Sequence, residues 1–214
     1  MIKGVLFDMD GVLVDSEYYI CSAAIMMFKE LGISASPKDF KPFTGMGENR
    51  YIGGVAENYG IIIDIEKVKA RTYEIYQEIV RDKLLPLPGA HEFIEKCRKK
   101  GFKLALATSA DRIKMEVNLK EIGLSAGVFD SIVSGIDVEQ KKPFPEIYLK
   151  AAKNLGLEPN ECLVVEDAVS GIKAGKTAGC RCLALTTTFN ASALSEADWI
   201  CESLLMVPDE VLNW

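Results

Sequence analysis

The chain has 214 residues, of which 49% are hydrophobic and 26% are charged. This composition suits a folded protein with a substantial core, and it excludes disordered and collagen-like chains. With 25 Lys and Arg against 31 Asp and Glu, the formal net charge is −6, which argues against nucleic acid as the main partner.

Neither a membrane nor a metal-thiolate site is indicated. No apolar run approaches the roughly 20 residues of a transmembrane helix. Asp8 and Asp10 stand where a signal peptide would still be apolar, so we expect a cytoplasmic protein without a membrane partner. The six cysteines form no C-x-x-C pair and have no histidine at metal-binding spacing. Reduced thiols are expected rather than zinc ligands or disulfides.

The first part of the chain contains one strand followed by helices. Residues 4–7 form a short apolar run that predicts a buried strand, and this run ends in the acidic cluster Asp8-Met9-Asp10-Gly11. A helical pattern begins at Asp15 or Ser16, either of which suits an N-cap, and it stops at Gly32. Further helices are predicted over 49–59 and 64–82. Residues 16–84 are therefore expected to form an all-α segment.

After residue 84 the pattern changes to alternating helices and strands. Helices are predicted over 89–100, 113–122, 145–155 and 169–178, and strands over 102–107, 131–133, 162–165 and 182–185, with an edge strand at 199–200. Repeated units of this kind predict an α/β fold, a parallel sheet with helices on both faces. Residues 1–15 and 85–214 would form this core, and residues 16–84 would be an insertion after the first strand.

Polar residues follow the predicted strands, and a parallel sheet would bring them to one edge, where ligands bind in such folds. They are Asp8, Asp10, Thr108, Ser109, Lys142, Glu166 and Asp167. Carboxylates two residues apart in extended chain repel each other unless a cation or proton intervenes. Oxygen ligands suit Mg²⁺ better than zinc. A nucleophilic carboxylate, a second acid, a hydroxyl and a lysine together fit phosphoryl transfer.

The chain also resembles a known family. The segment Asp8-Met9-Asp10-Gly11-Val12-Leu13-Val14-Asp15-Ser16 is similar to the first motif of the haloacid dehalogenase superfamily, in its phosphatase and β-phosphoglucomutase-like branch. The other motifs follow in the family's order: Thr108-Ser109, Lys142-Pro143 with Pro145, and the run from Val165 to Gly175. The resemblance covers nearly the whole chain and implies a Rossmann-like core with a helical cap.

The resemblance also implies a role for each motif residue. Asp8 would be the nucleophile and Asp10 the general acid and base. Thr108 and the backbone N–H of Ser109 would bind the phosphoryl group, and Lys142 would neutralise its charge. Asp8, the backbone carbonyl of Asp10, and Asp167 would ligate Mg²⁺, with Glu166 in or next to that set.

In the cap, the turn containing Gly45 precedes a helix that carries Arg50. The equivalent turn in the family faces the active site, so Gly45 and Arg50 are candidate substrate-binding residues. Arg50 would clamp a second anionic group or simply face water. The mutases of the family have a histidine in the first cap helix, where this chain has Ile20, which weighs against mutase activity.

These observations predict a monomeric Mg²⁺-dependent phosphatase of small phosphorylated metabolites, with sugar phosphates as one candidate class. The alternatives are a β-phosphoglucomutase-like phosphomutase and a non-catalytic protein that binds a phosphometabolite. Residues 16–84 hold 9 basic and 10 acidic residues, a net charge of 9 − 10 = −1. The cap therefore has no excess positive charge that would attract a highly charged anionic substrate.

Overall fold

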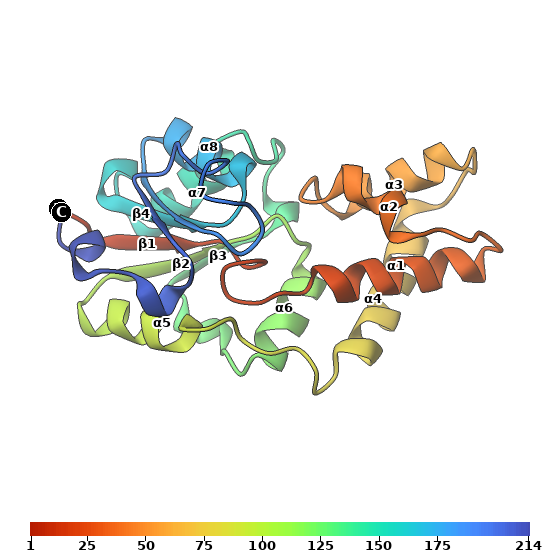
Figure 1. The fold of residues 1–214 in the computed structure, drawn as a ribbon, viewed down its shortest axis with the longest axis horizontal. Helices are drawn as coiled ribbons and strands as arrows, with labels where there is room; N and C mark the ends of the chain where they lie inside the picture. Colours follow the sequence, from red (N-terminus) through yellow and green to blue (C-terminus); the bar gives the residue numbers. More distant parts are fainter.

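A computed structural model describes residues 1–214 and contains one six-stranded sheet (Figure 1). Its strands are β1 (Gly4–Phe7), β2 (Lys103–Ala107), β3 (Ser131–Val133), β4 (Cys162–Glu166), β5 (Arg181–Leu185) and β6 (Trp199–Cys201). They lie in the order β3-β2-β1-β4-β5-β6, and every neighbouring pair is parallel. The chain order reverses beside β1, so a crevice is expected at the carboxyl end of that central strand.

Successive side chains along each strand point to opposite faces of the sheet, so the hydrophobic core has one part on each face. Val5 and Phe7 of β1 pack on the side covered by α5 (Ala90–Lys99) and α6 (Arg112–Glu121). Leu6 packs on the other side, against α7 (Glu146–Leu155) and α8 (Val169–Ala178). Both faces are buried, and this explains why the central strands are continuously apolar rather than alternating with polar residues.

The four remaining helices form a second lobe beyond the carboxyl ends of the strands (Figure 1). They are α1 (Glu17–Glu30), α2 (Pro37–Phe40), α3 (Glu48–Asn58) and α4 (Ile65–Val80). Aromatic packing supports this lobe, since the ring of Phe40 lies 5.6 Å from that of Phe28 and 5.0 Å from that of Tyr51. The domain limits at 16 and 84 stay a prediction, although all four helices lie between them.

Two antiparallel segments join the lobes. The N–H of Leu87 donates to the carbonyl of Leu13 at 2.9 Å, and Val14 forms an antiparallel bridge with Pro86. The outgoing and returning chain therefore support each other where they enter and leave the cap.

The predicted helices and strands are all present, with ends that differ by a few residues. One short helix, α2, was not predicted, because its single turn is too brief to show a period. Ser16 does occupy the position before α1, but its side chain makes no capping bond and instead donates to Asp10.

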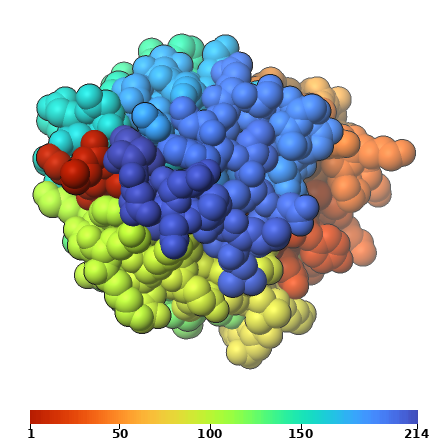
Figure 2. All heavy atoms as spheres, turned by 60° about the vertical axis from the view of Figure 1, so that its left-hand side comes forward, coloured from red at the N-terminus to blue at the C-terminus, as the bar shows by residue number.

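The two chain ends meet at the amino end of the sheet, away from the cap. Figure 2 shows the N-terminal residues beside the C-terminal segment, and the N–H of Ile2 donates to the carbonyl of Trp214 at 3.1 Å. All six cysteines are free thiols. None of the helices combines the length and apolar character needed to cross a membrane.

Candidate active site

A cavity of about 740 Å³ lies between the sheet and the cap. The core supplies Asp8 just after β1, Thr108 just after β2, and Glu166 and Asp167 at the end of β4. Lys142 enters from the loop between β3 and α7. The cavity thus forms where the strand order reverses, and eight of the nine predicted site residues line it, all except Arg50.

Lys142 is the cation at the centre of this group. Its Nζ lies 2.6 Å from Asp8 Oδ1 and 2.7 Å from Glu166 Oε1, and it also donates to the carbonyl of Ala107 at 3.3 Å. Burial would lower the pKa of Lys142, but Asp8 and Glu166 outweigh burial and raise the pKa above its ordinary value. The two carboxylates therefore favour the charged form of the ammonium. The neighbouring Lys141 instead donates to the carbonyl of Gly135.

Glu166 is held on both of its oxygens. Tyr148 Oη donates to Oε1 at 2.9 Å, and the backbone N–H groups of Asp167 and Ala168 donate to Oε2 at 2.9 Å each. With Lys142, these bonds occupy the carboxylate. Gly171 allows α8 to approach, since a Cβ there would lie 1.8 Å from Glu166 Oε1. Glu166 is therefore held in a position where its carboxylate orients the ammonium of Lys142.

Three buried carboxylates, Asp8, Glu166 and Asp167, offer oxygens that lie within 4.8 Å of one another. Together with Lys142 their formal charge is −3 + 1 = −2 when all are ionised. Burial is the main reason that the pKa of Asp8 is raised to about 7 and that of Asp167 well above its ordinary value. A cluster of hard oxygen donors with two excess negative charges fits a divalent cation such as Mg²⁺.

Gly11 keeps Asp167 close to the turn after β1. Its φ is +77°, and a Cβ on this residue would lie 1.9 Å from Asp167 Oδ2. Only glycine suits this position, because both the left-handed conformation and the contact exclude a side chain.

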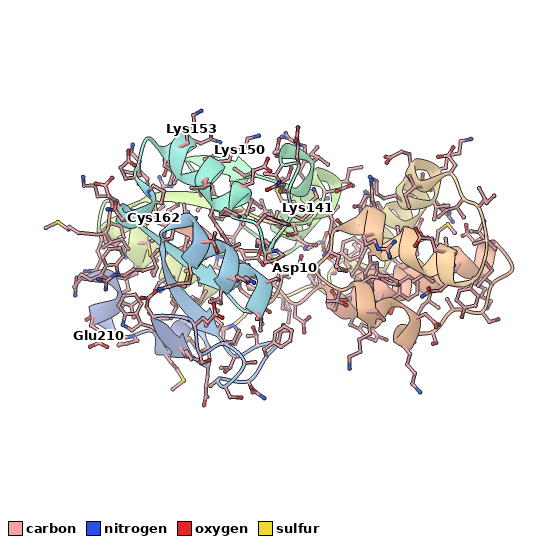
Figure 3. All side chains as sticks on the ribbon, turned by 90° about the horizontal axis from the view of Figure 1, so that it is seen from above. Asp10, Lys141, Lys150, Lys153, Cys162 and Glu210 are labelled. Atoms are coloured by element: carbon pink, nitrogen blue, oxygen red, sulfur yellow. The ribbon has the colours of Figure 1, made fainter.

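Asp10 has a different environment, with its carboxylate held at the junction of core and cap. Its Oδ1 accepts from Ser16 Oγ and, at 3.4 Å, from Asn118 Nδ2, and its Oδ2 lies 2.9 Å from Lys114 Nζ. Tyr76 of α4 donates to Asn118 Oδ1, which adds a contact from the cap. Figure 3 shows Asp10 where the two lobes meet.

Ser16, Lys114 and Asn118 were not predicted as site residues. Lys114 and Asn118 are one turn apart on α6, and both are buried. That i, i+4 pair of polar residues on a buried face is the signal that could have found them.

Thr108 and Ser109 also line the cavity. Thr108 is buried, and its Oγ1 accepts from the N–H of Ala110 at 3.1 Å. The hydroxyl proton of Thr108 is therefore available for an oxygen in the cavity.

The cap closes the cavity from the opposite side. Gly45, Glu48 and Tyr51 line it, as does Ile20. Arg50 does not belong to this lining: its guanidinium pairs with Glu57 at 2.7 Å and covers the ring of Phe43. The structure thus places Gly45 on the cavity and Arg50 on the outer side of α3.

Comparison with known proteins agrees with this geometry. The family model of the haloacid dehalogenase-like hydrolases matches residues 5–185. The chain belongs to this family.

Two curated relatives and one solved structure illustrate the similarity. The chain is 34% identical over 223 residues to the phosphorylated carbohydrates phosphatase of Thermotoga maritima, covering 99% of this chain and 97% of the relative. It is 44% identical over 199 residues to the chloroplastic protein SUPPRESSOR OF QUENCHING 1 of Arabidopsis thaliana. That match covers 92% of this chain but only 19% of the relative's length. CbbY from Rhodobacter sphaeroides in complex with phosphate superimposes with a TM-score of 0.88 at 25% identity, covering 100% of both chains.

Proposed function

We propose that this member of the family is a Mg²⁺-dependent phosphatase that hydrolyses small phosphorylated metabolites through a phosphorylated Asp8. Family membership and the phosphatases among the relatives make the chain a phosphoric monoester hydrolase. The observation that carries the mechanism is the position of Asp8, 2.6 Å from Lys142 and beside Glu166 and Asp167 in the same cavity.

In the first step an oxygen of Asp8 attacks phosphorus and the bond from phosphorus to the ester oxygen breaks. Asp10 donates its proton to that leaving oxygen, so an alcohol departs and an aspartyl-phosphate remains. In the second step Asp10 takes a proton from water, the water oxygen bonds to phosphorus, and the Asp8–phosphorus bond breaks. Inorganic phosphate leaves and both carboxyl groups return to their starting states.

Three groups bind the phosphoryl oxygens during these steps. The Thr108 hydroxyl and the backbone N–H of Ser109 donate hydrogen bonds, and Lys142 offsets the charge that develops. The ammonium of Lys142 also favours the ionised form of Asp8, which burial disfavours. Lys142 would therefore both favour the ionised form of Asp8 and bind the phosphoryl group that Asp8 attacks.

Asp8, Asp167 and the backbone carbonyl of Asp10 would hold the metal. Bound there, Mg²⁺ supplies positive charge that reduces the repulsion between the Asp8 carboxylate and the phosphate dianion. We assign Glu166 to the support of Lys142, because its oxygens already accept bonds from four donors.

The test is hydrolysis of p-nitrophenyl phosphate and a panel of metabolite phosphoesters, with Mg²⁺ and with excess chelator. Asp8→Asn keeps the shape of the side chain but removes the nucleophile, so kcat/KM should fall by at least about 10⁴-fold. Chelation should abolish turnover, and readdition of Mg²⁺ should restore it. Full activity of Asp8→Asn would reject the mechanism.

Phosphorus NMR of the products separates this proposal from a phosphomutase. Free phosphate is the expected product, whereas a rearranged phosphosugar would indicate a mutase. Binding of phosphoesters without any turnover would indicate a non-catalytic protein.

A further inference from the structure

Lys114 of α6 is a buried cation in the lining of the cavity, and the mechanism above gives it no part. Its side chain is 6% exposed, and its Nζ lies 2.9 Å from Asp10 Oδ2. Taking two charges out of water costs free energy, and well-packed apolar residues in place of a buried ion pair often leave a protein equally or more stable. The stability of the fold therefore does not explain this lysine, and its effect on Asp10 has to be considered.

The carboxylate of Asp10 is held only by side chains. Oδ2 accepts from Lys114, and Oδ1 accepts from Ser16 and, at 3.4 Å, from Asn118. Glu166 differs, because two backbone N–H groups donate to its Oε2. The position of the Asp10 carboxylate in the cavity therefore depends on its three side-chain donors.

The local structure explains how α6 supplies two of these donors. The helix begins a short turn after β2 ends, so its first residues lie at the same edge of the sheet as Asp10. Lys114 and Asn118 are four residues apart and share one face of the helix. Tyr76 of the cap donates to Asn118 Oδ1, and the amide nitrogen of Asn118 is then directed toward Asp10.

Lys114 is the only charged donor to Asp10. A hydrogen bond from an ionised donor to a carboxylate is stronger than one from a neutral donor such as Ser16 or Asn118. A second lysine of the cavity, Lys142, is bonded to Asp8 and Glu166 instead. The two carboxylates that the mechanism uses thus have separate lysines.

We propose that Lys114 is a positioning residue that holds the carboxylate of Asp10 within reach of the leaving oxygen of the substrate. This inference rests on the proposed function, because it takes Asp8 as the nucleophile and Asp10 as the acid and base. A displacement of a reacting group by about 1 Å can lower a rate about 10²-fold. Without Lys114 the carboxylate loses its strongest bond, and proton transfer to the leaving oxygen becomes inefficient.

The experiment compares p-nitrophenyl, phenyl and alkyl phosphates, whose leaving groups depend increasingly on a proton from Asp10. The ratio kcat/KM reports the steps up to departure of the alcohol, so hydrolysis of the aspartyl-phosphate does not affect it. In Lys114→Met, kcat/KM should fall about 10²-fold for alkyl phosphates, less for phenyl phosphate, and stay within about threefold for p-nitrophenyl phosphate. The kcat for p-nitrophenyl phosphate should fall, because the second step needs Asp10 as the base.

A double variant shows whether Lys114 acts through Asp10. Asp10→Asn removes the acid, so its losses should follow the same order of esters and reach about 10²- to 10⁴-fold for alkyl phosphates. If Lys114 serves only to place Asp10, the double variant Asp10→Asn/Lys114→Met should be no less active than Asp10→Asn. A lysine that bound the substrate directly would add a loss of its own.

Two further variants complete the experiment. Lys114→Gln keeps a hydrogen-bond donor without the charge, so its losses should follow the same order of esters and be smaller than those of Lys114→Met. Lys120→Met is the matched control, because Lys120 lies on α6 but is exposed and away from the cavity. It should leave kcat/KM unchanged for every ester. An unchanged kcat/KM for p-nitrophenyl phosphate shows that a variant is folded.

Three results would overturn the inference while phosphatase activity persists. They are no loss in Lys114→Met with any ester, equal losses with all esters in Lys114→Met and Lys114→Gln, and a further loss in the double variant relative to Asp10→Asn. If the wild type hydrolysed none of the esters, the proposed function itself would be rejected, and the role of Lys114 with it.

Discussion

The two walls of the cavity differ in how their buried polar atoms are paired. On the core wall, Lys142 bonds to Asp8 and Glu166, and Glu166 accepts from a tyrosine and two backbone N–H groups. No buried side-chain oxygen or nitrogen of the core lining lacks a partner. On the cap wall, Glu48 Oε2 is such an atom.

On the core wall these bonds exist before any substrate binds, and stabilisation of a transition state requires polar groups that are already oriented. On the cap wall, the buried carboxyl of Glu48 has no such set of bonds on Oε2.

The largest effect is expected from Lys142→Met on the core wall. This change leaves three buried carboxylates without their cation, so kcat/KM should fall at least about 10²- to 10³-fold. Removing one partner of a buried ion pair should also lower the free energy of unfolding by about 3–5 kcal/mol. Steady-state kinetics and urea denaturation measure the two effects.

Lys141→Met is the control, because Lys141 bonds only to backbone carbonyls. Its kcat/KM should stay within about threefold of the wild type. Equal losses in the two variants would show that Lys142 has no special part in the site.

A smaller effect is expected from Gly11→Ala. The added Cβ would lie 1.9 Å from Asp167 Oδ2, so Asp167 must move, and the Mg²⁺ concentration for half-maximal activity should rise roughly 10- to 100-fold. Gly32→Ala is the matched control, with a φ of +80° and no atom within 4 Å of the new Cβ. The measurement is activity as a function of Mg²⁺ concentration. Equal half-maximal Mg²⁺ concentrations in the two variants would contradict the expectation.

The smallest effect concerns the pH dependence of stability and tests the cap wall. Burial raises the pKa of Glu48 from 4.5 to about 7. The neutral carboxyl therefore favours the folded state below pH 4.5, and this contribution is lost as the pH rises through 7.

Glu48→Gln stays neutral throughout, so its Tm relative to the wild type should increase between pH 5 and 8 by a few degrees, at roughly 2–4 °C per kcal/mol. Differential scanning calorimetry at constant Mg²⁺ makes the comparison. A constant or decreasing difference over this range would show that Glu48 is not buried as described.

The sequence predicted the sheet well because buried parallel strands are short apolar runs bounded by turns, as at 162–165. It also pointed to the edge of the sheet, since Asp8, Thr108 and Asp167 directly follow strands. The helix α2 was missed because a single turn between Pro37 and Phe40 has no period to detect.

The surroundings of Asp10 and the cap wall could not be predicted in the same way. Lys114 and Asn118 look like ordinary polar residues of an amphipathic helix, and only the packing of α6 against the cap buries them. Glu48 at the start of a helix usually stabilises the helix dipole from the surface. Its burial depends on how α3 is seated over the core.

The meeting of the chain ends has a consequence for larger architectures. Ile2 and Trp214 lie together at the amino end of the sheet, and the cavity is lined by residues at the carboxyl ends of the strands. Polypeptide attached at either terminus would leave the molecule on the side opposite the substrate entrance. A further domain joined at either end would therefore not block the entrance by its point of attachment.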